Sequence, residues 1–203
     1  MLDTVVNLDI DAVAGKVSAA LKAGADPRAV LNDGLSAGMR VVGERYQSGE
    51  YFLTELLLAG EVMKAGLAPL EPLLTSTDIK GKGTVVLATV KGDIHDLGKN
   101  LVGMMLNASG FEVIDLGSDV APQRVVDAVR AHKAKIVGLS MLLTPMIVSL
   151  KSTLEEIAKA GLRGQVKVIL GGACTTPGLA KEMGCDGYGE DAMSAVYLCE
   201  SFI

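Results

Sequence analysis

The most reactive candidate group in the sequence is the imidazole of His95, one of two histidines in the chain. Asp93 precedes it by two residues and Asp96 follows it directly, within the segment VKGDIHDLGKN. An imidazole that binds a metal needs its second ring nitrogen to donate a hydrogen bond, because that bond fixes the tautomer and makes the ligand more basic. Asp93 could accept this bond. The pattern predicts a metal-ligating histidine supported by a carboxylate; the alternative is an ordinary loop histidine beside a capping aspartate.

Small residues accompany this histidine. Gly92 and Gly98, on either side of it, let the backbone bend around a bulky group. A later apolar segment ends in Ser140, which would face the same ligand crevice as the His95 loop. Another ends in Gly171-Gly172, where no side chain would block a ligand. Three such motifs, each after a short apolar segment, favour a shared ligand site.

Other kinds of site are absent from the sequence. It has no G-x-x-x-x-G-K-[ST] or G-x-G-x-x-G loop, and no Ser or Cys beside His95 forms a nucleophile motif. A zinc site on this loop would lack ligands, whereas one protein ligand suffices for a metal that arrives already chelated. His132, in the charged run RAHKAK, is expected on a solvated helix face. The cysteines are expected as small buried side chains in a reduced compartment; they are Cys174, Cys185 and Cys199.

The elements that position these loops alternate between strand and helix over residues 84–203. Prolines stand where three of the helices would begin, at Pro122, Pro145 and Pro177. Five such units predict an α/β fold with a doubly wound, parallel, five-stranded sheet of flavodoxin-like order, which binds ligands outside the carboxyl ends of its strands. The expected strands are Thr84–Thr89, Glu112–Leu116, Ile136–Ser140, Val166–Leu170 and Cys185–Tyr188, and the expected last helix is Asp191–Phe202.

Residues 1–74 carry helical patterns and no strand signals. Apolar residues recur at helical spacing from Val13 to Leu21, and Asp26-Pro27 is typical of an N-cap followed by proline at the first helical position. A further long helix is expected over Leu53–Gly66. With a short helix before Asn7, this segment would form a four-helix bundle.

The segment 75–83 (TSTDIKGKG) is polar and glycine-rich, and we expect it to link the two halves. Residues 1–74 carry six basic and ten acidic groups, and the whole chain has a net charge of −5 with 3% aromatic residues. This composition argues against a nucleic-acid partner, which needs phosphate neutralisation or base stacking. No apolar run approaches the ~20 residues of a membrane span and no targeting pattern is visible, so we expect a cytoplasmic protein without a membrane partner.

In combination, D-x-H-x-x-G, S-x-L and G-G on a flavodoxin-like domain resemble the cobalamin-binding family. The segments VGERY (42–46) and GEYFL (49–53), followed by Met63-Lys64, resemble the helical cap domain of methionine synthases and corrinoid methyl-carrier proteins. The resemblance covers essentially the whole chain, in the family's order of cap and then Rossmann-like domain. It departs at Tyr46, where Phe is familiar, and at Thr54, where Pro is expected.

The resemblance implies a role for each of these residues. His95 would be the lower axial ligand of cobalt, in place of the corrinoid's own benzimidazole. Asp93 would accept from the other imidazole nitrogen, and Ser140 would extend that hydrogen-bonded chain. Tyr46 and Leu53 would cover the upper face of the corrin, and their alternative role is bundle core. The slot for the displaced nucleotide tail would be lined by Gly98, Gly138, Gly171 and Gly172. The further implied cofactor contacts are Gly92, Asp96, Leu142, Thr144, Tyr188 and Asp191.

The resemblance also implies the activity. The cobalamin or related corrinoid would accept a methyl group from a substrate-specific methyltransferase, be methylcobalamin in the loaded state, and pass the group to a second methyltransferase. That enzyme's acceptor would be tetrahydrofolate or a thiol, and a reductive activase is a further candidate partner. Because the sequence holds no other catalytic constellation, we expect a methyl carrier without a catalytic site of its own. Donor specificity would reside in the partner, and residues 1–74 would move as a lid about the linker.

Three alternatives remain at this point. The small subunit of an adenosylcobalamin-dependent mutase shares D-x-H-x-x-G but would not need the cap pattern of Tyr46–Met63. A cobalamin-binding regulatory sensor would need a DNA-binding module with a basic face, whereas residues 1–74 are acidic. A fragment of methionine synthase is the third, although the sequence ends directly after the last expected helix.

Overall fold

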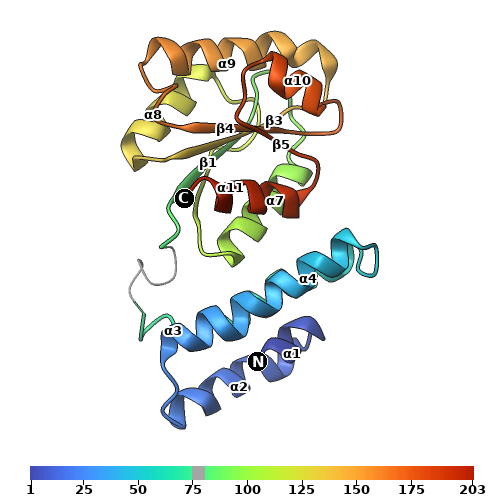
Figure 1. The fold of residues 1–203 in the computed structure, drawn as a ribbon, viewed down its shortest axis with the longest axis vertical. Helices are drawn as coiled ribbons and strands as arrows, with labels where there is room; N and C mark the ends of the chain where they lie inside the picture. The colour runs from blue at the N-terminus through green and yellow to red at the C-terminus, as the bar shows by residue number, and fades with distance from the viewer. Residues whose placement is uncertain (75–80) are drawn as a thin grey trace. The chain divides into compact units, whose positions relative to one another are not determined.

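The computed structural model describes residues 1–74 and 81–203 (Figure 1). The chain divides into two compact units, one with Met1–Gly81 and Ala108–Gly110 and the other with Lys82–Asn107 and Phe111–Ile203. Most of the predicted linker, residues 75–80, lies outside the described residues. No helix in the described ranges combines the length and the apolar character that a bilayer span requires.

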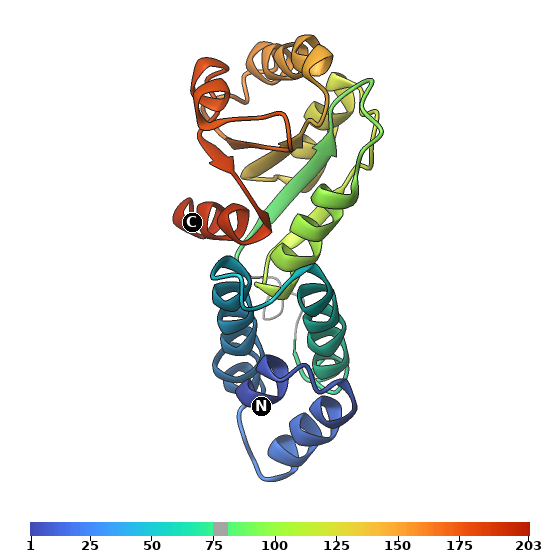
Figure 2. The ribbon, with the colours of Figure 1, turned by 90° about the vertical axis from the view of Figure 1, so that its right-hand side faces the viewer.

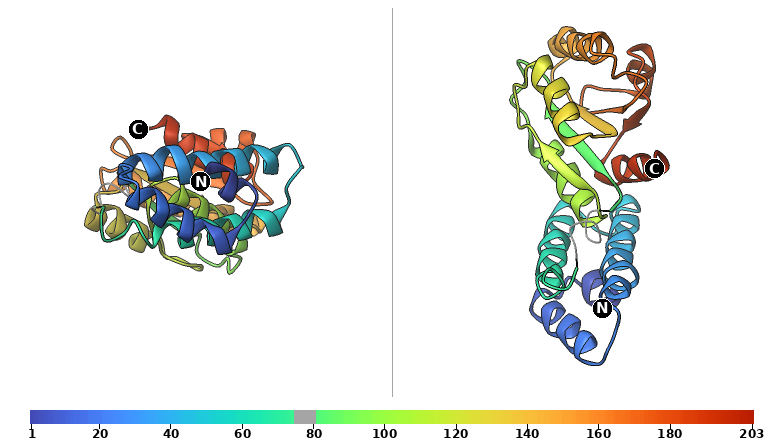
Figure 3. Two further views of the ribbon diagram at one scale, coloured as in Figure 1. Left: turned by 90° about the horizontal axis from the view of Figure 1, so that it is seen from below. Right: turned by 90° about the vertical axis from the view of Figure 1, so that its left-hand side faces the viewer.

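The first unit is the predicted helical bundle (Figures 2 and 3). Within it α1 packs against α4, and α2 packs against α5. The carboxylate of Asp9 caps α2 by accepting from the Ala12 N–H, and Asp26 caps α3 just before Pro27. Both caps satisfy amides that lack a partner in the first helical turn. The elements are α1 (Leu2–Val6), α2 (Ile10–Lys22), α3 (Pro27–Ala29), η1 (Val30–Ser36), α4 (Ala37–Gln47) and α5 (Leu53–Leu67).

A π-helical segment, η1, joins α3 to α4. The apolar stripe that runs from Val30 to Val42 after Asp26-Pro27 predicts one continuous α-helix here. The buried residues here recur at intervals of four. A spacing of four exceeds the roughly 3.6 residues of one α-helical turn. A row of residues with this spacing would therefore shift around the helix axis and leave the core face. The wider π turn corrects the drift and keeps both rows on one face. The two rows are Val30, Gly34, Gly38 and Val42, and Leu31, Leu35 and Met39.

The second unit contains a five-stranded parallel sheet in the order β2-β1-β3-β4-β5, which confirms the predicted fold. The predicted last strand begins too early, because the Cys185 N–H bonds to the Ala180 carbonyl and so completes the turn after a helix. The strands are β1 (Thr84–Thr89), β2 (Glu112–Asp115), β3 (Ile136–Ser140), β4 (Lys167–Gly171) and β5 (Gly187–Gly189).

Helices cover both faces of this sheet: α8, α9 and α10 lie over one face, and α7 and α11 over the other (Figures 1 and 2). Pro122 and Pro177 begin α8 and α10 as predicted, whereas Pro145 lies in the 3₁₀ turn η2 (Thr144–Met146) that precedes α9. The helices are α7 (Leu97–Ala108), α8 (Pro122–His132), α9 (Ile147–Lys159), α10 (Pro177–Glu182) and α11 (Ala192–Ser201). Asp191 is the N-cap of α11 and Phe202 its C-cap.

The strand register brings the predicted motifs to one edge of the sheet. Thr89 at the end of β1 pairs with Ser140 at the end of β3, and Ser140 pairs with Gly171 at the end of β4. The chain order reverses between β1 and β3, so this edge contains the switch point at which such sheets bind ligands.

A substitution at Gly172 tests how closely the ends of these strands and their loops pack. The φ of Gly172 is +120°, and a Cβ placed there would lie 2.1 Å from the Met141 carbonyl oxygen. We expect Gly172→Ala to lower the free energy of unfolding by about 3 kcal/mol, because both the conformation and the space exclude a side chain. The control is Gly178→Ala in α10, where the nearest atom to an added Cβ lies at 3.7 Å. Urea denaturation measures both variants, and equal stability would contradict the close approach.

Candidate functional site

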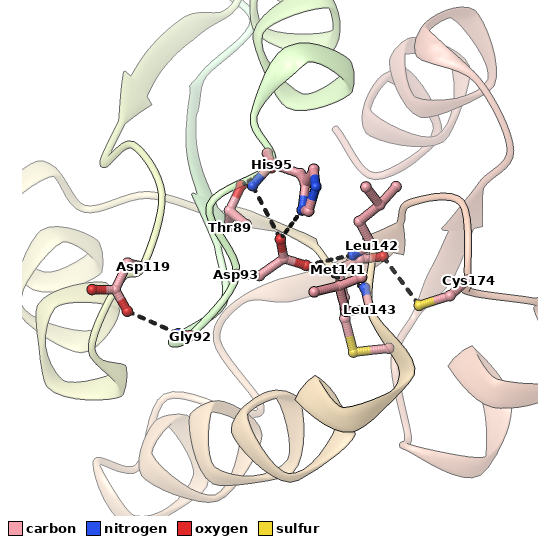
Figure 4. Close-up of polar contacts among 9 residues, drawn as sticks. All are labelled: Thr89, Gly92, Asp93, His95, Asp119, Met141, Leu142, Leu143 and Cys174. Carbon is pink, nitrogen blue, oxygen red and sulfur yellow. Dashed lines mark hydrogen bonds and ion pairs between the residues drawn. The ribbon is translucent and has the colours of Figure 1, made fainter.

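Asp93 and His95 face each other in the loop that follows β1 (Figure 4). The Asp93 side chain is fully buried, whereas 47% of the His95 side chain is exposed. Asp93 Oδ1 accepts from the His95 main-chain N–H at 3.0 Å and lies 2.7 Å from the ring Nδ1. An aspartate that accepts from the amide two residues later is a common local turn. The D-x-H spacing is therefore what brings the imidazole over the carboxylate.

The second oxygen of Asp93 is held from the neighbouring strand. Oδ2 accepts from the main-chain N–H groups of Leu142 at 2.6 Å and Leu143 at 3.3 Å, just after β3. Burial by itself would raise the pKa of Asp93, but the hydrogen bonds from Leu142, His95 and Leu143 outweigh it, so the pKa lies below its ordinary value. Asp93 is consequently ionised at neutral pH.

The charge on Asp93 decides which nitrogen of His95 is available. A carboxylate without a proton can only accept, so in a neutral imidazole Nδ1 carries the proton that faces Asp93. Nε2 then presents its lone pair. The hydrogen bond to Asp93 uses Nδ1, and about half of the side chain is exposed to solvent. Nε2 can therefore bind a metal that approaches from the solvent side.

Ser140 lies beside the site, but in the part of the chain that the structure describes no direct bond runs from its hydroxyl to Asp93. It ends β3, beside the site, but within the described residues the link from this segment to Asp93 is made by the amides of Leu142 and Leu143 and not by the Ser140 hydroxyl. The amides suffice because they are already aimed at the buried oxygen. Backbone amides leave no mark in residue types, so the sequence could not single them out. A relay through Ser140 stays a prediction.

Exposed aliphatic side chains lie next to His95 in the same loop and in the loop after β3, a feature that the sequence reasoning did not single out. Ile94 is 75% exposed and Leu97 69% exposed, although both are large and apolar. Leu143, whose amide contacts Asp93, is also exposed. Exposed apolar groups that gather around a polar centre mark a ligand site. The available signal was the presence of large aliphatics in a loop that is otherwise polar and rich in glycine.

The four glycines predicted to line a slot differ from one another. A Cβ on Gly98 would meet open space. A Cβ on Gly138 would lie 2.5 Å from Leu87, and those on Gly171 and Gly172 would approach the carbonyl oxygens of Gly189 and Met141. Three of the four therefore have a packing reason to be glycine, because neighbouring strands and loops press against them. Gly92 lies under Met146 and takes a positive φ of 86°.

The remaining predicted contacts lie at or near the same edge. Asp96 is exposed, and its carbonyl accepts from Asn100 at the start of α7. Thr144 is exposed at the start of η2. The Tyr188 hydroxyl donates to the Thr175 carbonyl at 3.1 Å, and Asp191 accepts from the Ser194 N–H as the cap of α11. The last two side chains thus already have partners within the fold.

The two predicted cap residues lie in the first unit. Tyr46 is half-buried in α4. Leu53 is the first residue of α5 and is 39% exposed, so its alternative assignment to the bundle core is wrong. Phe52, directly before Leu53, and Leu57, one helical turn after it, are also exposed. Leu53 therefore belongs to an apolar surface at the start of α5.

Cys174 approaches the site from the loop after β4. Its Sγ lies 3.5 Å from the Met141 carbonyl oxygen (Figure 4). Burial and the negative charge of Asp93 raise the pKa of this thiol. It therefore stays protonated at neutral pH, and a thiol is a poor metal ligand compared with a thiolate. In the described residues no group of three or more His, Cys, Asp or Glu side chains is placed to hold a bare metal ion.

These residues fit a metal that carries its own equatorial ligands. His95 offers one exposed nitrogen, a buried carboxylate keeps it basic, and apolar side chains suit the face of a large ring. Comparison with known proteins agrees with this fit. The family model described as "B12 binding domain" matches residues 83–197, and a second model with the same description matches residues 1–71.

Relatives match over nearly the whole chain. The trimethylamine corrinoid protein 2 of Methanosarcina acetivorans is 41% identical over 96% of this chain and 90% of its own length. The crystal structure of a cobalamin-binding protein from Desulfitobacterium hafniense is 37% identical, with a TM-score of 0.84 over 100% of this chain and 96% of that chain. A chain of the methanol:cobalamin methyltransferase complex MtaBC from Methanosarcina barkeri is 29% identical, with a TM-score of 0.86 over 98% of this chain and 76% of that chain.

The matches include the segment that carries the Asp93–His95 pair as well as the helical unit. With both units matched, and with an exposed imidazole backed by a buried carboxylate, the chain belongs to the B12-binding family of corrinoid proteins.

Proposed function

We propose that this protein carries a methyl group between two methyltransferases, on the cobalt of a corrinoid. The observation that carries the proposal is the half-exposed imidazole of His95, whose Nδ1 is held by the buried, ionised Asp93. The chain presents a single ligand to a chelated metal. Relatives over nearly the whole chain are named as corrinoid proteins of trimethylamine and dimethylamine systems, which favours a methyl carrier over the mutase subunit.

The residues below the cofactor would bind and orient it. When bound, the corrinoid supplies a cobalt centre that can accept a methyl group and give it up. His95 would hold the cobalt through Nε2, and Asp93 would keep that nitrogen electron-rich by accepting from Nδ1. Ile94, Leu97 and Leu143 would exclude water from the lower face, because they are exposed and apolar and belong to the loops that carry His95 and the amides bound to Asp93.

The residues above the cofactor would come from the first unit. Leu53, with Phe52 and Leu57, forms an exposed apolar surface that would shield the upper face of the corrin from water. The same face must meet the partners' active sites, so the first unit would act as a lid about the linker at 75–83. The first partner would be a methyltransferase specific for a methylated amine, in view of the relatives' names. The second would use an acceptor such as tetrahydrofolate or a thiol, and a reductive activase would restore oxidised cobalt.

The mode of ligation gives the first test of this proposal. We expect electron paramagnetic resonance of the Co(II) form to show splitting by an imidazole nitrogen, because Nε2 of His95 is the available ligand. With uniformly ¹⁵N-labelled protein and unlabelled cofactor, the splitting should change from a ¹⁴N to a ¹⁵N pattern. The variant His95→Ala should lose it. An unchanged splitting in the labelled protein would mean that the corrinoid keeps its own benzimidazole, and the role of His95 would be wrong.

Asp93→Asn tests whether the carboxylate tunes the ligand. An amide carries no charge and has only one oxygen, so it can accept from Nδ1 but then turns its NH2 group toward the Leu142 amide. Corrinoid should be retained while methyl transfer slows by about 10–100-fold. The matched control is Asp96→Asn on the other side of His95, which changes the net charge equally but lies exposed. The Co(II)/Co(I) potential and both transfer rates are the measurements. Equal effects of the two variants would leave Asp93 with no special role.

Leu53→Ser tests the apolar surface of the first unit. We expect corrinoid binding and the EPR splitting to persist, while the reduced cobalt is oxidised several-fold faster because water reaches the upper face. Leu2→Ser is the control, since Leu2 is a leucine of the same unit with a similar exposed fraction, 36% against 39%. Stopped-flow spectroscopy of the reduced form follows the oxidation. Identical oxidation rates in the two variants would remove Leu53 from the shield.

A further inference from the structure

Thr89 also holds the main chain of His95, through the carbonyl group and not through the N–H group that Asp93 binds. Its hydroxyl donates to the His95 carbonyl oxygen at 3.0 Å (Figure 4). The His95 N–H is bound to Asp93, so both main-chain polar groups of His95 have a partner. Thr89 is fully buried, and a buried hydroxyl without an acceptor is costly. The hydroxyl therefore ties the position of His95 to the position of Thr89.

Thr89 is itself anchored on two sides. It is the last residue of β1 and pairs with Ser140 of β3. Its N–H donates to the Gly117 carbonyl at 3.0 Å, and its carbonyl accepts from the Val120 N–H at 3.1 Å. These bonds join β1 to the loop after β2. One hydroxyl group thus fixes the position of the His95 main chain relative to the end of β1 in the sheet.

Asp119, in the loop after β2, holds the other end of the histidine loop. Its carboxylate accepts from the Gly92 N–H at 2.8 Å and pairs with the Lys91 ammonium at 2.9 Å. Its own N–H donates to the Asp93 carbonyl at 2.8 Å. Asp119 has a φ of +54°, a left-handed conformation that few residues other than Gly, Asn and Asp adopt. A strained residue that makes two bonds to one short turn is typical of a positioning element.

We propose that Thr89 and Asp119 are positioning residues for the metal ligand, which together hold residues 92–95 so that His95 presents Nε2 at one place and angle. This inference rests on the proposed function only in naming cobalt as the metal. Asp93 sets the tautomer of the imidazole, whereas Thr89 and Asp119 set its location. A ligand held in place before binding loses less conformational entropy on binding, which favours ligation by His95 over ligation by the corrinoid's own base.

The test at Thr89 compares three variants. Thr89→Val keeps the shape and removes the hydroxyl, and Thr89→Ser restores the hydroxyl. Thr153→Val is the matched control, because Thr153 is also buried and donates to a main-chain carbonyl, that of Ser149, at 2.9 Å in α9. In the protein without corrinoid, NMR hydrogen exchange of the His95 amide should be about five- to tenfold faster in Thr89→Val alone. In the loaded protein, the ¹⁵N-sensitive EPR splitting should weaken in Thr89→Val and return in Thr89→Ser.

The test at Asp119 does not depend on a buried position, since its side chain is 48% exposed. Asp119→Asn keeps an acceptor for the Gly92 N–H and tolerates the left-handed conformation, so it should behave as wild type. Asp119→Gly keeps the conformation but removes the acceptor, and it should speed exchange of the Gly92 amide and reduce the fraction of cobalt bound through His95. If Thr89→Val does not fold, this pair of variants decides the inference.

The outcomes separate the inference from the function beneath it. If Thr89→Val and Asp119→Gly show wild-type exchange at His95 and Gly92 and wild-type EPR splitting, the positioning role is overturned even though the protein binds corrinoid. If wild-type protein shows no imidazole splitting, the role of His95 in the proposed function falls. Faster amide exchange in the same variants would then still support the hold of Thr89 and Asp119 on the loop.

Discussion

The buried carboxylate of Asp93 is the interaction on which the site depends. An ionised group without solvent contact is unfavourable unless hydrogen bonds replace the water that it loses. Here three main-chain N–H groups, from His95, Leu142 and Leu143, supply that replacement, and the imidazole of His95 adds a fourth contact. Because these donors follow two different strands, the charge can be buried only when β1 and β3 are side by side. The electrostatics of the Asp93–His95 pair therefore depend on the assembly of the sheet.

Close backbone packing follows from the same constraint. The loop after β3 directs its amides at Asp93 while Met141 lies against the loop after β4. At this contact a Cβ on Gly172 would lie only 2.1 Å from the Met141 carbonyl oxygen. Met141 is also bonded through its N–H to the Gly171 carbonyl. Gly171 and Gly172, at the end of β4, thus let Met141 pack closely enough for the next two amides to reach the Asp93 carboxylate. The proposed role of these glycines in accommodating a nucleotide tail is compatible with their role in strand packing, because both require backbone without side chains.

The sequence predicted the sheet well because its signals are local and repeated. Short β-branched segments, prolines at helix starts and glycine-rich loops each recur, and β1 and β3 have the predicted bounds. The prediction was weaker where main-chain groups carry the structure. The amides of Leu142 and Leu143 hold Asp93, and main-chain amides cannot be recognised from residue types. The π-helical segment η1 likewise became visible only once the four-residue spacing of buried side chains was set against the helical repeat.

The exposed state of the imidazole completes the physical picture. A histidine that serves the fold is usually buried or fully solvated, whereas His95 is held at three points and still shows half of its side chain. The free energy needed to desolvate and orient Asp93, and to fix the His95 main chain, is provided when the domain folds. Only the Nε2 face is left unsatisfied. In the proposed function, a metal that arrives with its own equatorial ligands would meet a nitrogen already oriented toward it, and the exposed side chains of Ile94 and Leu97 would lose water under the ring. Preorganisation of the polar part by folding and burial of the apolar part on binding would be complementary, and together they give the proposed function a physical basis: one protein side chain would hold a large cofactor.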